Sequence, residues 1–545
     1  MPVRGTVYQA FRRSVDAFPT SEFLCVLPHT AAHYGIETRS YSYTEAAREV
    51  EVLLRRYRAA GFGHGHRAGL MLENRPAFFF HWLALNALGI SVVPINPEWR
   101  SAELQYLIDH SEMGVAVAPP ERAADLTHAA ANAGRPLAIA TSELTELREA
   151  PTAVPRPQEQ VGVDTECALL YTSGTTGRPK GCVLPNEYYL WAGSWYAQID
   201  GLCEIVPGAE RLITPLPMSH MNAMAYSTMA MLLTGGCVIP LDRFHPSVWW
   251  DSVRRARATI VHYLGVMPAM LLGAPCGEQD RDHCVRFGFG AGVSPRLHAT
   301  FEERFGFPLL EAWAMTETGA GAVVIAHREP RKVGTACFGR PQAAVEYRVV
   351  DELGDAVAPG EPGELLVKHA GAQPRFGFFR EYLKDPEATA EAWEGGYFRT
   401  GDIVRVDTEG DFHFVDRKKN VIRRSGENIS AVEVESVLLQ HSEIAGVGVT
   451  AVPDAVRGDE VMACIVPRRL LTEAEQARFA HEVVDFCLAR LAYFKAPGYV
   501  AICERLPLTP TEKIQRAALK ELALALRISS ACVDTRARKK RGPVA

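Results

Sequence analysis

The sequence predicts an α/β protein, with a large N-terminal α/β domain of several subdomains followed by a smaller α+β domain. Helix-like and strand-like stretches alternate through much of the chain, which favours layers of helices on sheets. The 545 residues are ample for two or more domains, each with its own core. After about residue 420 the pattern changes to short strands and capped helices over about a hundred residues, a usual domain size.

The composition is that of a soluble globular enzyme, with 47% hydrophobic and 22% charged residues. The net charge of −6 gives no electrostatic case for nucleic acid. The start has no apolar signal-peptide core, and two prolines, His81 and Asn86 break the most apolar stretch, residues 76–94, so we expect no integral membrane segment. Twelve cysteines without a C-x-x-C pair argue against a zinc site or a redox dithiol and indicate a reducing cytoplasm.

In the large domain, hydrophobic periodicity predicts four early elements. They are an amphipathic helix over residues 46–57, a strand over 68–72, a buried helix over 78–88 and a strand over 91–95. Residues 135–159 are rich in proline, alanine and charge, and predict a surface connector.

In the small domain, Ser430 with Glu433 and Thr472 with Glu475 form capping boxes at the starts of two helices. Strands are expected over residues 447–451, 461–466 and 499–503. The polar segment 416–420 marks the boundary between the domains. We therefore expect an N-terminal domain over 1–416, a hinge over 417–419, a C-terminal domain over 420–525 and a basic, disordered tail over 526–545.

Residues 171–181, Tyr-Thr-Ser-Gly-Thr-Thr-Gly-Arg-Pro-Lys-Gly, follow an apolar strand-like run. Glycines let backbone N–H groups approach phosphates, hydroxyls donate hydrogen bonds, and Arg178 and Lys180 supply charge. The spacing is not that of a Walker loop. The segment predicts a triphosphate site, and the candidate residues are Thr172, Ser173, Gly174, Thr175, Thr176, Gly177 and Lys180.

This loop resembles the phosphate loop of the superfamily of acyl-CoA synthetases, peptide-synthetase adenylation domains and firefly-type luciferases. Residues 311–319, Glu-Ala-Trp-Ala-Met-Thr-Glu-Thr-Gly, resemble a second motif of that family, with Ala314 at a common glycine position. The resemblance implies that Trp313 stacks on adenine, that Thr316 contacts the phosphates and that Glu317 ligates Mg²⁺. A carboxylate suits a hard cation beside phosphate. Five motifs in the family's order extend the resemblance from about residue 7 to 525.

Two further segments, 398–402 and 414–429, resemble the ribose and hinge motifs. The resemblance implies that Asp402 accepts hydrogen bonds from both ribose hydroxyls, since a carboxylate offers two acceptor oxygens. It also implies that Arg417 contacts the ribose, that Lys419 is the hinge and that Gly426 lies beside the pantetheine channel. The ending Ser-Gly-Glu-Asn-Ile resembles CoA ligases more than peptide synthetases.

Three other segments complete the resemblance. Residues 506–516 resemble the C-terminal motif whose lysine, here Lys513, catalyses adenylation, with Glu512 at a common glycine position. Residues 215–220 resemble a segment ending in a histidine near the acyl carboxylate, here His220. Residues 289–294 resemble a glycine-rich strand end beside adenine and the acyl group. Its candidate residues are Gly290, Ala291 and Gly292.

Together these residues imply an ATP-dependent carboxylate–CoA ligase, with ATP, Mg²⁺ and coenzyme A as cofactors and a small carboxylic acid as substrate. The acid is first joined to AMP, and Lys513, the phosphate loop and Mg²⁺ neutralise the charge on the phosphates. In the family, the small domain then rotates about the hinge so that the CoA thiol reaches the acyl-adenylate.

Several alternatives stay open. The second step could use a carrier protein or be oxidative, and a catalytically inactive protein that binds an acyl group or nucleotide is a further alternative. The acid could be aliphatic, aryl, steroid-derived or carnitine-like, although the hinge and C-terminal stretch resemble the carnitine/crotonobetaine–CoA ligase branch. The methionines between residues 218 and 231, and Trp191 with Trp195, could line a substrate pocket or pack in the core. The oligomeric state is left open.

Overall fold

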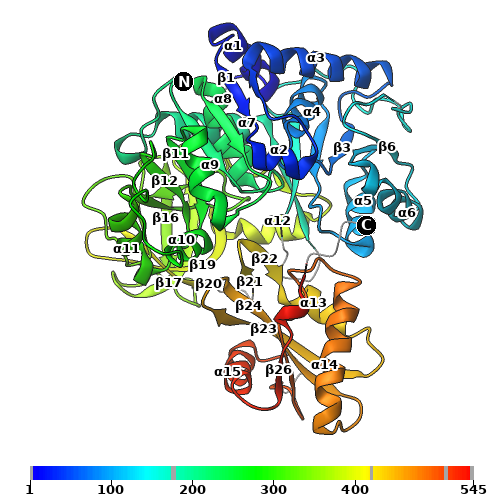
Figure 1. Ribbon diagram of the computed structural model, residues 1–545, viewed down its shortest axis with the longest axis vertical. Coiled ribbons are helices and arrows are strands. Elements are labelled where there is room, and N and C mark those ends of the chain that lie inside the picture. The colour runs from blue at the N-terminus through cyan, green and yellow to red at the C-terminus, as the bar shows by residue number, and fades with distance from the viewer. Residues whose placement is uncertain (1–3, 146, 173–178, 418–420, 509–513, 541–545) are drawn as a thin grey trace.

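The computed structural model describes residues 4–145, 147–172, 179–417, 421–508 and 514–540. Figure 1 shows a large upper lobe and a smaller lower lobe. The chain passes from the upper lobe to the lower one after β20 (Phe412–Arg417). The expected hinge residue Lys419 lies outside the described residues.

One sheet of the large lobe has seven strands, in the order β18-β8-β7-β4-β3-β5-β6. Its strands are β3 (Arg67–Leu70), β4 (Ser91–Pro94), β5 (Val115–Val117), β6 (Ala138–Ala140), β7 (Glu166–Thr172), β8 (Lys180–Pro185) and β18 (Glu381–Tyr382). The strands expected at 68–72 and 91–95 are β3 and β4, whereas the expected connector 135–159 contains the short strand β6. Successive residues of a strand point to opposite faces of this sheet and so belong to two different hydrophobic cores. Val92 lies on the face covered by α4 (Pro76–Ala87), and Val93 lies on the opposite face.

The other sheet runs β16-β17-β19-β20-β15-β14-β13-β12-β11-β9-β10-β1-β2. Its strands before β20 are β1 (Glu22–Cys25), β2 (Ser40–Ser42), β9 (Arg211–Thr214), β10 (Cys237–Pro240), β11 (Ile260–Leu264), β12 (Phe287–Ala291), β13 (Leu309–Trp313), β14 (Val324–Ile325), β15 (Cys337–Pro341), β16 (Val345–Val350), β17 (Pro362–His369) and β19 (Phe398–Val406). From β1 to β13 the inner strands are parallel. The segments after β9, β11, β12 and β13 therefore leave the sheet at one edge, where ligands bind in open α/β sheets.

Helices fill the space between the two sheets. The buried faces of α1 (Val7–Ala17), α3 (Tyr43–Ala59), α4, α7 (Asn186–Gln198) and α8 (Thr228–Thr234) share one core with strands of both sheets. The expected helices 46–57 and 78–88 are α3 and α4. The outer helices are α5 (Ser101–Ser111), α6 (Ala123–Ala133), α9 (Trp249–Ala256), α10 (Val266–Leu272) and α11 (Pro295–Phe305). Among the described residues, no helix combines the length and apolar character that a membrane span requires.

The small lobe is an α+β unit, as expected. Its elements are β21 (Val421–Arg424), β22 (Glu427–Ser430), α13 (Ala431–Leu438), β23 (Ile444–Asp454), β24 (Gly458–Pro467), α14 (Glu473–Leu488), β25 (Tyr499–Ile502), α15 (Arg516–Arg527) and β26 (Cys532–Asp534). The capping box at Thr472 and Glu475 forms, but only half of the box expected at Ser430 does. Ser430 accepts from the Glu433 backbone, whereas the Glu433 side chain binds Lys495 instead.

The expectation of a disordered tail from residue 526 is wrong for the residues described there. β26 pairs antiparallel with β25, and Thr535 Oγ1 donates to the Pro497 carbonyl at 2.9 Å. Lys539 is fully buried and pairs with Glu460, which also binds Arg424. Lys539 is held on the small lobe because Glu460 supplies a buried counter-charge.

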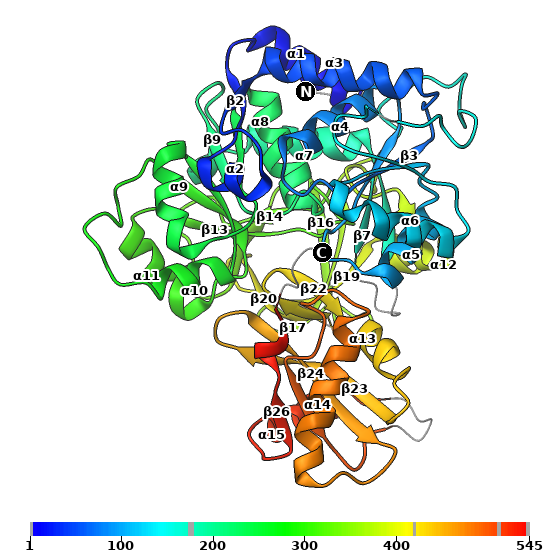
Figure 2. The same ribbon diagram turned by 45° about the vertical axis from the view of Figure 1, so that its right-hand side comes forward.

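An ion cluster connects the two lobes at α5. Lys495 Nζ of the small lobe lies 2.6 Å from Glu103 Oε1 on α5 and 2.8 Å from Glu433 Oε1 on α13. Glu103 Oε2 also accepts from the Ala492 backbone at 3.0 Å. Burial alone would lower the pKa of Lys495, but the two carboxylates outweigh it and raise the pKa, so the ammonium stays charged. Figure 2 shows α5 of the large lobe above α13 of the small lobe.

Candidate active site

A cavity of about 530 Å³ lies where the two lobes meet. Its walls come from the ends of β7 and β8, the segment after β9, the segment after β13, and β19. The small lobe closes it with β21 and the turn before β22. Among the predicted site residues, those that line the cavity are Thr172, Lys180, His220, Thr316, Glu317, Asp402 and Gly426.

The carboxylate of Glu317 lies in the cavity wall beside Thr172, Lys180 and Tyr382. Its Oε1 accepts hydrogen bonds from Thr172 Oγ1 at 3.3 Å and from the Tyr382 hydroxyl at 3.0 Å. Burial, and the negative charge of Glu317, raise the pKa of Tyr382, so the phenol stays a donor. Lys180 Nζ lies 4.8 Å from the centre of the Tyr382 ring. Residues 173–178 of the predicted loop lie outside the described residues.

The donor set around Glu317 fits Mg²⁺. Magnesium in nucleotide sites is bound by one or two carboxylates together with substrate phosphates and water. Glu317 offers one such carboxylate on the cavity wall, with Thr172 beside it and Lys180 nearby. Thr316 also lines the cavity, and its carbonyl is held by the Tyr188 hydroxyl at 2.9 Å.

The second predicted carboxylate, Asp402, is held by Trp313. The indole Nε1 donates to Asp402 Oδ2 at 2.8 Å, and the Asp402 backbone N–H donates to Thr400 Oγ1 at 3.0 Å. Trp313 is 6% exposed, and its ring stacks on Phe338 with the centroids 6.2 Å apart. Trp313 therefore positions the acceptor oxygens of Asp402, a role that the sequence did not suggest. Its stacking on adenine stays a prediction.

The predicted Gly290–Ala291–Gly292 turn ends β12 and is held by Glu311 of β13. Glu311 Oε2 accepts from the Gly292 backbone at 2.9 Å, and Oε1 accepts from the Tyr263 hydroxyl at 2.7 Å. A Cβ at Gly290 would lie 2.3 Å from the Tyr263 carbonyl oxygen, so this position requires glycine. None of the three residues of this turn lines the 530 Å³ cavity, and their contacts with adenine and the acyl group stay predictions.

His220 lies in the wall between the lobes. Its Nε2 is 3.5 Å from Glu427 Oε2 of the small lobe. The His220 side chain is 41% exposed; its partial removal from water would lower its pKa, but the hydrogen bond and charge of Glu427 outweigh this effect and raise the pKa. After His220 the chain forms a π-helix, η3 (Asn222–Ser227), a rare conformation that is frequent at functional sites.

The small lobe presents the turn around Gly426 to the cavity. Gly426 has a φ of +90°, and a Cβ there would lie 2.2 Å from Leu264 Cδ1, so a side chain would push the lobes apart. Arg423 and Asn428 line the same wall. Lys513 lies outside the described residues, but its described neighbour Ile514 packs on the lobe's own core and does not line the cavity.

Arg417 pairs through its backbone with Asp402 of β19, and its side chain lies outside the described part of the chain. Trp191 and Trp195 donate to Ala320 and Gln342 from within the large lobe, and neither lines the cavity. The described methionines near His220 are buried in the core, except Met221, which lines the cavity.

Sequence reasoning missed three residues of the site. Tyr382, Glu311 and Glu427 act through contacts with residues far away in the chain. Glu311 and Glu427 stood inside the quoted motifs, but nothing in the sequence showed that they face the Gly292 turn and His220. Tyr382 had no motif around it.

A carboxylate beside hydroxyls and a lysine, a second carboxylate held by an indole, and a small lobe closing the cavity are typical of the class of adenylate-forming enzymes. The chain belongs to the AMP-binding enzyme family, whose pattern residues 12–382 match. Residues 433–513 match the AMP-binding enzyme C-terminal domain.

Individual relatives support the assignment of the chain to this family. The chain is 30% identical over 496 residues to a crotonobetaine/carnitine–CoA ligase of Citrobacter koseri, covering 88% of this chain and 93% of the relative. Its fold is similar to o-succinylbenzoate CoA synthetase of Bacillus subtilis, with a TM-score of 0.78, 23% identity, and 95% and 98% of the two chains covered. It is also similar to a malonyl-CoA ligase, with a TM-score of 0.69, 27% identity, and 89% and 96% covered. The expected family, fold class and enzyme class, an AMP-forming acyl-CoA synthetase, are confirmed.

Proposed function

We propose that the protein is an ATP-dependent carboxylate–CoA ligase whose phosphate, ribose and CoA contacts all meet in the cavity between the lobes. The observation that carries this is that Glu317, Asp402 and the Gly426 turn line one space. The first two residues come from the large lobe and the third from the small lobe, as a two-step ligase requires.

In the first step, the acid's carboxylate oxygen attacks the α-phosphorus of ATP and pyrophosphate leaves. Thr172, Thr316 and Lys180 donate to the phosphates, because hydroxyls and an ammonium stabilise charge best in a dry cleft. Mg²⁺, when bound by Glu317, supplies further positive charge there. Asp402 accepts hydrogen bonds from the ribose hydroxyls. Lys513 catalyses adenylation when the small lobe is in its rotated position.

In the second step, the thiol of CoA displaces AMP from the acyl group. The arrangement described here suits this step, because the small lobe turns Arg423, Gly426 and Asn428 towards the cavity. We propose that rotation about residues 417–419 exchanges this face for the one carrying Lys513. Lys419→Pro, which fixes φ, then traps the lobe, so adenylate forms while CoA transfer fails.

For the substrate, we propose a small carboxylic acid bound near His220. The apolar part of the wall there is formed by Leu216, Met221, Leu264 and Met315. The relatives named for crotonobetaine and carnitine make these two acids the first to test. All twelve cysteines are unpaired, which supports the proposed cytoplasmic location.

Pyrophosphate release from MgATP, measured across acids with and without CoA, tests the proposal. The acids are acetate, hexanoate, octanoate, benzoate, a steroid-derived acid, crotonobetaine and carnitine. We expect release that depends on one acid and turns over only with CoA, and Glu317→Gln should abolish it. Release that stops after one turnover despite CoA would point to a different acceptor.

A further inference from the structure

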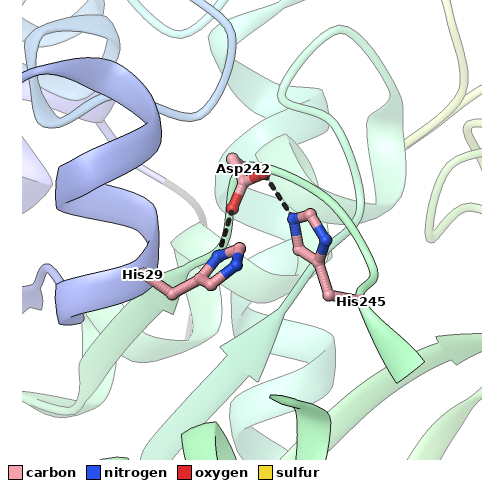
Figure 3. Close-up of side chains that lie close together, drawn as sticks. All are labelled: His29, Asp242 and His245. Atoms are coloured by element: carbon pink, nitrogen blue, oxygen red, sulfur yellow. Dashed lines mark hydrogen bonds and ion pairs between the residues drawn. The ribbon is translucent and has the colours of Figure 1, made fainter. Parts of the chain in front are cut away.

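Three histidines surround one buried carboxylate where α2 (Pro28–Tyr34) meets the loop after β10. His29 and His33 are one helical turn apart on α2, and Asp242 and His245 belong to the loop. His245 Nε2 lies 2.7 Å from Asp242 Oδ2, and His29 Nδ1 lies 3.8 Å from Oδ1. Figure 3 shows the two rings turned towards Asp242 from either side.

The surroundings favour a cation at this carboxylate. The side chain of Asp242 is 1% exposed, and an ionised carboxylate removed from water needs a partner charge. Its neighbours are Thr30 Oγ1 at 3.5 Å, His33 Nδ1 at 3.9 Å and Arg243 Nε at 3.8 Å. The Arg243 side chain is 44% exposed, so it can turn into solvent when a cation binds.

The donor atoms are those of a transition-metal site. Imidazole nitrogen and carboxylate oxygen bind zinc at about 2.0–2.2 Å, which puts tetrahedral ligands about 3.4 Å apart. The ligand atoms of His29, Asp242 and His245 already lie within 4.8 Å of one another. His29 is 46% exposed and His245 20%, so small ring rotations close the remaining gap.

We propose that His29, Asp242 and His245 bind a divalent ion of the zinc class. Two nitrogen donors favour zinc, nickel or copper over magnesium, which prefers oxygen. The site is therefore chemically distinct from the magnesium site at Glu317. The lack of C-x-x-C pairs does not argue against this metal site, because its ligands are imidazoles and a carboxylate.

A metal here would fasten α2 to a wall of a second cavity. Asp242 and Phe244 line a space of about 310 Å³ that Ser425 of the small lobe also lines. Asn74 Nδ2 donates to the carbonyl of Leu241, and Asn74 Oδ1 accepts from the Met218 backbone. The loop is thereby joined to the segment that ends at His220.

Zinc titration of the full-length, chelator-stripped protein tests the site. We expect calorimetry to give one Zn²⁺ per chain and the midpoint of thermal unfolding to rise with zinc, because a ligand that binds the folded state stabilises it. Magnesium at the same concentration should not compete. His245→Ala and His29→Ala should each weaken zinc binding at least tenfold, whereas His128→Ala, an exposed histidine on α6, should not.

Two results would overturn the proposal. One is the absence of stoichiometric zinc binding by the unmodified protein. The other is unchanged zinc affinity in His29→Ala, whose exposed side chain makes it a safe substitution for folding. Circular dichroism and ATP binding of each variant establish that it is folded, so a lost zinc site is not mistaken for a lost fold.

Discussion

Replacing Glu103 by glutamine should slow the CoA step and leave adenylation intact. Glu103 is the large-lobe member of the ion cluster with Lys495, whereas Glu433 belongs to the small lobe with Lys495. Rotation of the small lobe about residues 417–419 would separate Lys495 from Glu103 but keep it beside Glu433. The substitution therefore weakens the arrangement described here more than the rotated one.

The magnitude follows from the burial of the cluster. Lys495 and Glu103 are each 6% exposed, and their charged atoms are 2.6 Å apart. Breaking a buried ion pair costs about 3–5 kcal/mol, which is an upper bound because Glu433 stays. A hydrogen bond to a charged group contributes about 1.5–3 kcal/mol, so the balance between the arrangements should shift about 10- to 150-fold.

The assay measures the two half-reactions separately. Adenylation is followed as the first-turnover release of pyrophosphate, and the CoA step as thioester formation from supplied acyl-adenylate at subsaturating CoA. We expect the CoA step of Glu103→Gln to fall at least tenfold, with adenylation unchanged or faster. Glu433→Gln is the matched control, because it removes a carboxylate that stays with Lys495 in both arrangements.

Equal loss of both half-reactions in Glu103→Gln would refute the reasoning, because it would mean that the cluster stabilises the protein as a whole. An unchanged CoA step would refute it as well. If Glu433→Gln split the half-reactions in the same way, the cluster would not be specific to one arrangement of the lobes.

Three further predictions concern the site. Lys513→Ala should reduce adenylation strongly yet leave thioester formation from supplied acyl-adenylate intact; loss of both would contradict lobe rotation. The raised pKa of His220 means that its ion pair with Glu427 is complete below about pH 6.5 and is lost as the pH rises through the raised value. The CoA step should therefore slow relative to adenylation over that range, and Glu427→Gln should flatten the profile. Trp313→Phe removes the donor to Asp402 and should raise the KM for ATP about tenfold, since such a bond contributes about 1.5–3 kcal/mol, with little change in kcat.

Much of the fold was predictable because hydrophobic periodicity acts locally. The helices α3 and α4, and the strands β3, β4, β23, β24 and β25, were expected within a few residues of their observed ends. The tail was not predictable, because its basic residues looked solvated until Glu460, 79 residues away from Lys539, supplied a buried partner. Half of the capping box at Ser430 was lost for the same reason, since Glu433 binds Lys495 instead.

The sequence by itself determined the family and indicated the residues of the candidate site. Motifs such as residues 171–181 and Glu317 bring the required residue types together within a few positions, so no folding is needed to see them. Only the tertiary structure decided which groups hold these residues in place: Tyr382 on Glu317, Trp313 on Asp402, and Lys495 between the lobes. These partners are tens to hundreds of residues apart, and a contact between them exists only once the sheets and the small lobe have folded against one another.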